Sequence, residues 1–477
     1  MAKKKGTLVN LVWRFLERFF AQIVTIVVSI ILARLLDPEV YGTIALVMVI
    51  MTILQVFVDG GFSTALIQKK DADDIDFSSV FFANITICLL LYAVVFFISP
   101  LIASFYGVNE LTSIIRVLGI TIIVSGLKGV QQAYVSRNLL FKRFFFATLI
   151  GTIVAAIVGV WMAYHGFGVW ALVAQYLVNA TIDTLVLWIT VKWRPRFVFS
   201  FKRLKTLFSF GWKIFSASIL TVFVKEIRQL IIGKKYSSED LAFYNRGHQF
   251  PDQGTQAINS SIDSVLLPVM SNEQSDKKAV KEMTRKAITL SSFCIWPVMG
   301  GLFACSPTII NLLLTEKWLP CVPYLQIFCI VYAFLPIQSA NLNAIKALGK
   351  SNKILVMQIL KDAISLTITI VSMFFGVFWI ALGSILSSFI SQIINSWPNK
   401  KLLNYGYREQ LSDILPIAIL SVAMGALVWL ISLIGLSSWR LLFLQVMVGI
   451  IIYFCGAKFF RLKAFTLFEQ SIKGFFK

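Results

Sequence analysis

Residues 414–434 read ILPIAILSVAMGALVWLISLI and contain no charged side chain. Their length matches the roughly 20 residues that an α-helix needs to cross about 30 Å of bilayer hydrocarbon. The apolar residues do not alternate with polar ones, as they would in a strand of a membrane β-barrel. This stretch therefore predicts a transmembrane helix.

Comparable apolar blocks recur along the whole chain and are separated by short polar segments. With 58% hydrophobic and 14% charged residues, 477 residues hold more apolar surface than a soluble domain of that size can bury. The sequence therefore predicts an all-α polytopic membrane protein with about fourteen transmembrane helices. The predicted spans lie near residues 12–36, 41–67, 80–105, 111–136, 144–165, 169–192, 207–233, 241–268, 286–314, 319–348, 354–377, 379–398, 411–434 and 439–460.

The lysines and arginines between the spans predict the orientation of the chain. With fourteen spans, 31 of the 44 basic residues fall on the side of the N-terminus and 6 fall on the other side. Cytoplasmic loops carry the excess of positive charge, so both termini are expected in the cytoplasm. This topology accounts for the net charge of +21 better than nucleic-acid binding, for which no basic soluble module is present.

A weak internal repeat predicts how the spans are grouped. Shifting the chain by 200 residues brings ILARLLDPE (residues 31–39) over IIGKKYSSE (residues 231–239), each at the end of a span. Six spans per half would relate two bundles by a pseudo-two-fold axis along the membrane normal. We expect bundles at 1–195 and 196–405, followed at 406–477 by two further spans and a cytoplasmic tail. Chance similarity between two apolar segments is the alternative.

The residues give no sign of enzyme chemistry. The six cysteines form no CxxC pair, and His165 and His248 stand alone, so neither a disulfide framework nor a metal site is expected. The phosphate-binding pattern GxxxxGK[ST] is absent, so transport would not draw on ATP hydrolysis by this chain. No catalytic residue or cofactor is predicted, and a gradient of H+ or Na+ would supply the energy.

Several segments of the chain resemble the polysaccharide transporter family of the multidrug/oligosaccharidyl-lipid/polysaccharide (MOP) flippase superfamily, the exporters of O-antigen, colanic-acid and teichuronic-acid type. The likeness covers most of residues 7–400, while the last two spans carry no such motif. The segments are ILARLLDPEVYG (31–42), DGGF (59–62), GFGVWALV (166–173), LIIGKKY (230–236) and FYNRG (243–247).

This resemblance implies a flippase that moves an undecaprenyl-diphosphate-linked oligosaccharide out of the cytoplasmic leaflet. It also implies membrane lipid, glycosyltransferases and a polysaccharide polymerase as partners. A cation-coupled multidrug exporter of the same superfamily is the first alternative. A membrane-embedded glycan polymerase is the second, although such an enzyme normally needs a large external loop, which this sequence lacks.

Basic residues within the predicted spans are the candidate substrate-binding groups. Charges inside a membrane are costly and usually face a water-filled path or one another. Arginine binds a diphosphate through two parallel hydrogen bonds and lysine binds it as a point charge. The candidates for the diphosphate and glycan cavity are Arg14, Arg18, Arg116, Lys128, Lys225, Arg228 and Arg246. The alternative for Arg14, Arg18 and Arg246 is that they extend to the lipid headgroups.

Acidic residues within the spans are the candidates for ion coupling, because a carboxylate can take up a proton or a sodium ion. They are Glu17, Asp59, Asp183, Glu226, Asp252 and Asp263. Glu17 and Glu226 could instead neutralise neighbouring basic residues. Asp59 could instead cap a helix break made by the two glycines that follow it.

Overall fold

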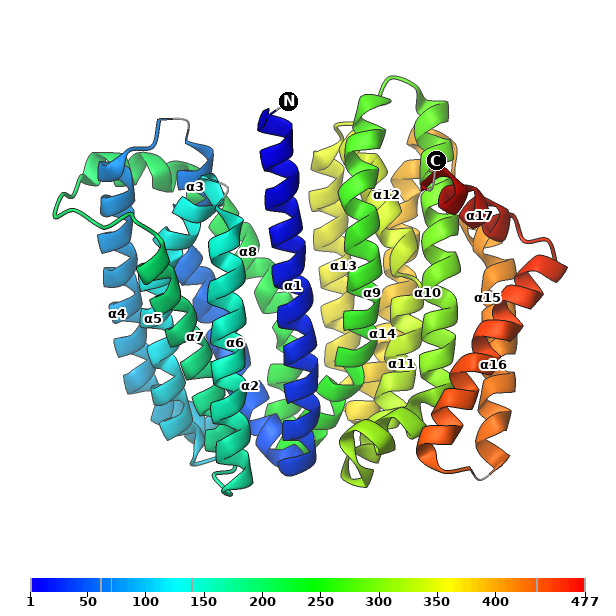
Figure 1. Ribbon diagram of the computed structural model, residues 1–477, viewed down its shortest axis with the longest axis horizontal. Helices are drawn as coiled ribbons and strands as arrows, with labels where there is room; N and C mark the ends of the chain where they lie inside the picture. The colour runs from blue at the N-terminus through cyan, green and yellow to red at the C-terminus, as the bar shows by residue number, and fades with distance from the viewer. Residues whose placement is uncertain (1, 61, 70, 139, 435, 476–477) are drawn as a thin grey trace. The chain divides into compact units, whose positions relative to one another are not determined.

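The computed structural model describes residues 2–60, 62–69, 71–138, 140–434 and 436–475. Across these residues the chain forms helices and no strand (Figure 1). The elements are α1 (Ala2–Leu35), α2 (Pro38–Asp59), α3 (Phe62–Gln68), α4 (Asp74–Tyr106), α5 (Leu111–Arg137), α6 (Phe141–Tyr164), α7 (Val169–Thr190), α8 (Phe201–Lys235), α9 (Ser238–Asn272), α10 (Lys277–Leu314), η1 (Glu316–Cys321), α11 (Val322–Ala333), α12 (Leu335–Ala347), α13 (Ser351–Ser372), α14 (Val377–Leu403), α15 (Tyr407–Ile431), η2 (Ser432–Ile434), α16 (Ser438–Phe459) and α17 (Lys463–Phe475). The all-helical prediction is confirmed.

Each predicted span coincides with one helix or with consecutive helices. The second span is divided into α2 and α3, and the tenth consists of η1, α11 and α12. Among the described residues, 11 helical segments are long and apolar enough to cross a membrane. Helices α1, α8 and α9 are not among them, so the count of fourteen crossings and the orientation stay predictions.

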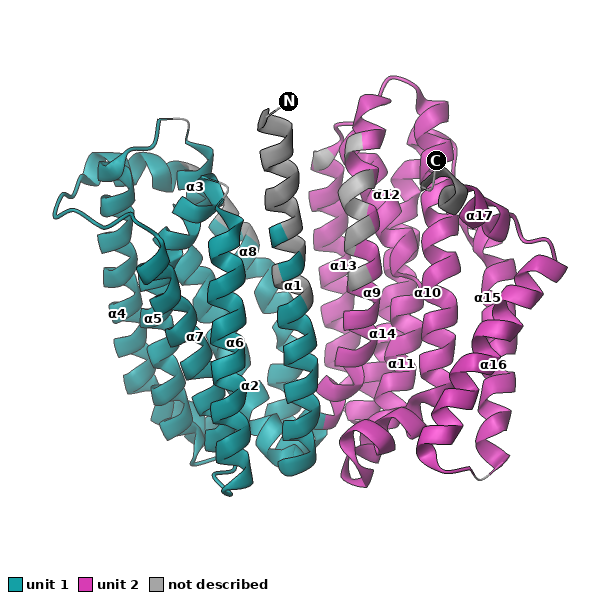
Figure 2. Ribbon diagram, viewed as in Figure 1, with its two compact units in different colours: residues 1–242 teal, residues 243–477 magenta. Residues whose placement is uncertain are grey.

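The chain forms two compact units, and the boundary between them in the sequence falls near the start of α9 (Figure 2). Unit 1 comprises Met1–Ala242 and unit 2 comprises Phe243–Lys477. Helix α8 belongs to unit 1 because it packs on α2, α3 and α4. The bundle boundaries drawn on the sequence repeat, 1–195, 196–405 and 406–477, stay predictions, as does the pseudo-two-fold axis.

Unit 1 is held together by close helix packing. Its core includes Phe77, Phe81 and Trp193, whose rings contact one another. The side chain of Asp73 accepts a hydrogen bond from the Asp76 amide at 3.1 Å, a capping box that begins α4. Gly42 of α2 lies so close to the start of α9 that a Cβ atom there would stand 1.6 Å from a backbone carbonyl oxygen.

Unit 2 is built around α10, which packs on α11, α12, α15, α16 and α17. Its interior includes a buried amide network, in which Asn341 Nδ2 donates to Gln410 Oε1 at 2.8 Å and Asn399 Nδ2 donates to Asn341 Oδ1 at 2.6 Å. The segment expected to be a cytoplasmic tail contains the helix α17. Its Phe465 and Phe468 pack on the core beside Phe293.

Candidate functional site

The second predicted span breaks in its middle. Helix α2 ends at Asp59, and Gly60 follows in the left-handed region with φ +44°, its amide donating to the Val56 carbonyl at 3.0 Å. Glycine suits this conformation because it has no Cβ atom. The predicted helix break is therefore present, and Asp59 lies directly at it. The Asp59 carboxylate accepts a hydrogen bond from Gln55 Nε2 at 3.3 Å, one turn earlier in the same helix.

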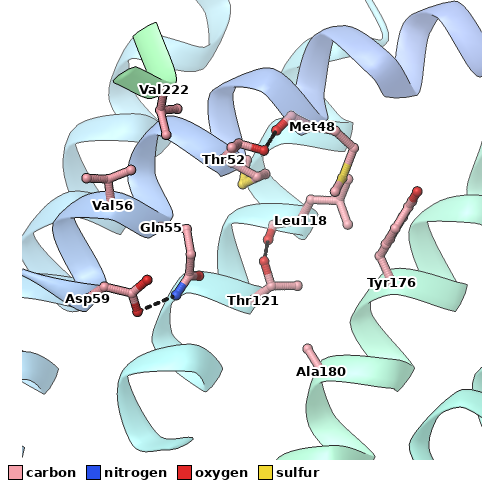
Figure 3. A pocket seen from close by; sticks show the side chains of 11 residues that line it. Met48, Thr52, Gln55, Val56, Asp59, Leu118, Thr121, Tyr176, Ala180 and Val222 are labelled. Atoms are coloured by element: carbon pink, nitrogen blue, oxygen red, sulfur yellow. Dashed lines mark hydrogen bonds between the residues drawn. The ribbon is translucent and has the colours of Figure 1, made fainter. Parts of the chain in front are cut away.

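Two cavities of unit 1 share Asp59 in their walls. Figure 3 shows the first of them. Their volumes are about 440 and 490 Å³, within the size range of small-ligand sites. Both are lined by Val56, Asp59 and Val222. The first cavity also has Met48, Thr52, Gln55, Thr121 and Tyr176 in its wall. The second also has Ser63, Thr64, Gln132, Ser136 and Ser218. Asp59 thus places a carboxylate where an apolar space meets a hydroxyl-rich one.

Lys128 of α5 and Asp183 of α7 form an ion pair, with Lys128 Nζ 3.0 Å from Asp183 Oδ2. The two side chains are 20% and 14% exposed. Lys128 is also close enough to Asp59 to attract its carboxylate. Unit 1 therefore brings together one predicted substrate-binding residue and two predicted ion-coupling residues, from three helices.

Arg116 of α5 is held by α4. Pro100 has no amide hydrogen, so it cannot donate to the Phe96 carbonyl four residues earlier. Arg116 Nε donates to this carbonyl at 3.3 Å and to Ser99 Oγ at 3.1 Å, and its guanidinium lies 4.2 Å from the centre of the Phe96 ring. Arg116 is not among the residues that line the two cavities. Its observed contacts thus supply a donor to the carbonyl that Pro100 leaves without its helical partner.

The charged triplet of α8 lies one to two turns beyond Val222. Lys225 is exposed and Arg228 is half-buried. Glu226 is only 8% exposed and accepts a hydrogen bond from Gln229 Nε2 at 2.5 Å. Lys225 also attracts the Glu226 carboxylate. This attraction agrees with the alternative that Glu226 neutralises a neighbouring basic residue.

Unit 2 holds the remaining described candidates, both on α9. Arg246 is 6% exposed, donates from Nη1 to Gln249 Oε1 at 2.8 Å, and lies 5.3 Å from the ring centre of the buried Trp318. It is therefore packed inside its unit. Asp252 is half-buried and receives a long hydrogen bond of 3.5 Å from Gln256 Nε2. The side chains of Arg14, Glu17, Arg18 and Asp263 lie outside the described residues.

Sequence reasoning did not select the polar partners of the charges. Gln55, Thr121 and Tyr176 line the first cavity, and none of them was a candidate. Only Gln55 could have been selected from the sequence, because a residue four positions before Asp59 lies on the same helix face.

The fold defines the class of protein. The structure superimposes on the lipid II flippase MurJ in an inward closed conformation with a TM-score of 0.76, 17% identity, and 94% of this chain and 99% of that chain covered. An inward-facing multidrug resistance MATE transporter of the MOP superfamily gives a TM-score of 0.63 at 13% identity, covering 80% of this chain and 94% of the other. The protein is a multi-pass membrane protein with the MOP transporter fold.

A family model described as "Polysaccharide biosynthesis protein" matches residues 31–323. The chain therefore belongs to this polysaccharide biosynthesis family, which confirms the resemblance to a polysaccharide family seen in its motifs.

The similar curated proteins come from several bacteria. The succinoglycan biosynthesis transport protein ExoT of Rhizobium meliloti is 24% identical over 67% of this chain and 65% of its own length. The teichuronic acid biosynthesis protein TuaB of Bacillus subtilis is 25% identical over 62% of each chain. The lipopolysaccharide biosynthesis protein WzxC of Escherichia coli is 22% identical over 83% of this chain and 82% of its own length. The matches thus span just under two thirds of the first two relatives.

Proposed function

We propose that this protein moves an undecaprenyl-diphosphate-linked oligosaccharide across the bacterial inner membrane by ion-coupled alternating access. Family membership and the names of the relatives, which concern succinoglycan transport and the biosynthesis of teichuronic acid and lipopolysaccharide, support a polysaccharide precursor as the substrate. The protein would act as a transporter rather than an enzyme. Glycosyltransferases and a polymerase would supply and consume the glycan.

The observation that carries the coupling step is the position of Asp59 at the junction of two cavities, within reach of the Lys128–Asp183 pair. When Asp59 is charged, the Lys128 ammonium is shared by two carboxylates. Binding of H+ or Na+ neutralises the Asp59 carboxylate. Lys128 then attracts Asp183 alone. The change occurs beside Gly60, where α2 gives way to α3, so it can alter the angle between these helices.

Cationic groups of unit 1 would receive the diphosphate. Lys225 and Arg228 are the first candidates, because they follow Val222, which lines both cavities. Replacing both by Gln should abolish glycan export and leave membrane insertion intact. The matched control is Lys234→Gln with Lys235→Gln, which removes the same charge from the last turn of the same helix. Normal export in the Lys225/Arg228 variant would remove these two residues from the site.

The test of the function is the sidedness of the lipid-linked oligosaccharide. Cells deleted for the protein are treated with an impermeant glycan-modifying enzyme, and the modified fraction of the lipid-linked pool is measured. The proposal expects the precursor to accumulate in the protected, cytoplasmic leaflet. Asp59→Asn should show the same accumulation, whereas Asp71→Asn, in an exposed turn, should export normally. Unchanged sidedness in the deletion strain would overturn the proposal and favour the multidrug exporter.

A further inference from the structure

A polar cleft of about 770 Å³ lies in unit 2 between α10, α15 and the N-terminal end of α17. Four basic and two acidic side chains line it. Arg285 and Asp413 pair with each other, with Nε 2.7 Å from Oδ2, and Asp413 also accepts from the Tyr405 hydroxyl at 2.7 Å. The remaining charges are those of Lys286, Arg461 and Lys463 against the single carboxylate of Glu282. The cleft therefore carries excess positive charge.

The backbone holds Arg461 at the cleft in an unusual conformation. Its φ is +50°, in the left-handed region. The Arg461 amide donates to the Lys458 carbonyl at 3.2 Å and the Leu462 amide donates to the Ala457 carbonyl at 3.0 Å. This is the Schellman arrangement that ends a helix, and glycine usually occupies the position of Arg461. An arginine thus occupies a backbone position that favours glycine, which has no side chain.

Unused donors also face the cleft. Lys463 and Ala464 line it at the first turn of α17, where amide groups lack partners within the helix and favour an anion. Thr289 of α10 is only 6% exposed and lines the cleft, and its hydroxyl makes no hydrogen bond to another described residue. The cleft thus combines excess cations, helix amides and a hydroxyl group available to donate, which is the complement of a phosphate.

The surroundings of the cleft favour a lipid phosphate over a free one. An apolar groove of about 490 Å³ is lined by α10, α15 and α16 and by Phe468 of α17. Neighbouring residues of α17 line the two spaces, Leu467 the cleft and Phe468 the groove. On α10, Thr289 lines the cleft and Phe293, one turn further, lines the groove. A molecule with a charged head and a hydrocarbon chain can contact both.

We propose that this cleft binds the headgroup phosphate of an anionic phospholipid from the cytoplasmic leaflet. The side of the membrane follows from the predicted orientation. Lys286, Arg461, Lys463 and the amides at the start of α17 hold the phosphate, and the hydrocarbon chain lies along the apolar groove. The site lies within unit 2, apart from the Asp59 cavities of unit 1, so it binds a lipid in addition to the transported one.

Purified full-length protein in detergent tests this proposal with three probes, dioleoyl-phosphatidylglycerol, dioleoyl-phosphatidylcholine and inorganic phosphate. Native mass spectrometry measures the binding of each probe. Melting curves recorded without lipid show whether each variant is folded. The test variant is Lys286→Gln with Arg461→Gly and Lys463→Gln. Its control, Lys277→Gln with Lys278→Gln and Lys458→Gln, removes three basic side chains from the same end of the unit but outside the cleft lining. Arg461→Gly alone serves if the triple variant does not fold, because glycine adopts the left-handed backbone readily.

We expect phosphatidylglycerol to bind the wild type and the control more tightly than phosphatidylcholine. A basic residue near an anionic lipid surface contributes about fivefold in affinity, so the test variant should lose roughly a hundredfold and Arg461→Gly about fivefold. Equal binding of the two lipids, an undiminished preference in the test variant, or an equal loss in the control would overturn the proposal. Saturation of the cleft by inorganic phosphate at the same concentration would overturn the lipid as the ligand. None of these measurements depends on transport.

Discussion

The ion pair between Lys128 and Asp183 should couple their contributions to the stability of unit 1. At 3.0 Å and an effective dielectric constant of about 20, two unit charges attract by about 5 kcal/mol before the cost of removing them from water. Removing one partner leaves the other as an unpaired, mostly buried charge, so Lys128→Gln and Asp183→Asn should each lower the free energy of unfolding by about 3 kcal/mol. The double variant removes both charges of the pair and should lose no more than either single one.

Equilibrium unfolding in mixed micelles of a mild detergent and dodecyl sulfate, followed by tryptophan fluorescence, measures these free energies. The expected coupling energy of the double-mutant cycle is about 3 kcal/mol. Arg196 and Asp74 provide the control, because they form a pair of 3.1 Å whose side chains are 73% and 46% exposed. Their cycle should give less than about 1 kcal/mol. Additive losses in the Lys128/Asp183 cycle would refute the proximity of these two charges.

The same double variant separates a structural pair from a coupling device. If Lys128 serves only to neutralise Asp183, the neutral pair restores both folding and glycan export. If Lys128 must also attract Asp59, the double variant folds but does not export, because no cation remains beside the carboxylate. Restored export would therefore refute the coupling role proposed for Lys128, even if the double-mutant cycle gives the expected coupling energy.

Three further predictions concern the helices around this site. Arg116→Met should lower the melting temperature, and Pro100→Ala should rescue much of that loss because alanine supplies the amide hydrogen that proline lacks. Gly42→Ala should reduce the yield of folded protein in fluorescence-detected chromatography, since its Cβ would meet a carbonyl oxygen at 1.6 Å and the helices must separate, at a cost of about 1–3 kcal/mol. A hydrogen bond from Arg203 lowers the pKa of Asp73 from 3.8 to about 2, so its contribution is present above pH 4 and is lost as the pH falls toward 2. When the pH is lowered from 5 to 3, the free energy of unfolding of the wild type should therefore fall by up to about 1 kcal/mol more than that of Asp73→Asn, because the side chain is half-exposed. Melting curves at the two pH values measure this difference.

The positions of the helices could be predicted from the sequence because crossing a bilayer demands an apolar run of a certain length. The break after Asp59 could also be predicted, since two glycines follow it. The splitting of residues 319–348 into η1, α11 and α12 was not predicted, because Pro320, Pro323 and Pro336 lie in a block that is apolar throughout.

The partners of the in-membrane charges could not be predicted, because apolar blocks do not reveal how each helix is rotated about its axis. Lys128 and Asp183 are 55 residues apart and were assigned to different roles. The contact of Arg246 with the ring of Trp318, 72 residues further along the chain, could not be predicted either. Helix α17 was overlooked because it is too short and too polar for a span, although its apolar residues recur at helical spacing.

Helices α1, α8 and α9 carry most of the candidate charges. Helix α1 contains three of them, α8 contains three and α9 contains three, while the 11 apolar segments share the remaining four. A charged helix at membrane depth is stable only where its polar face meets water or other polar groups. If α1, α8 and α9 cross the membrane, their charges require a hydrated path along them.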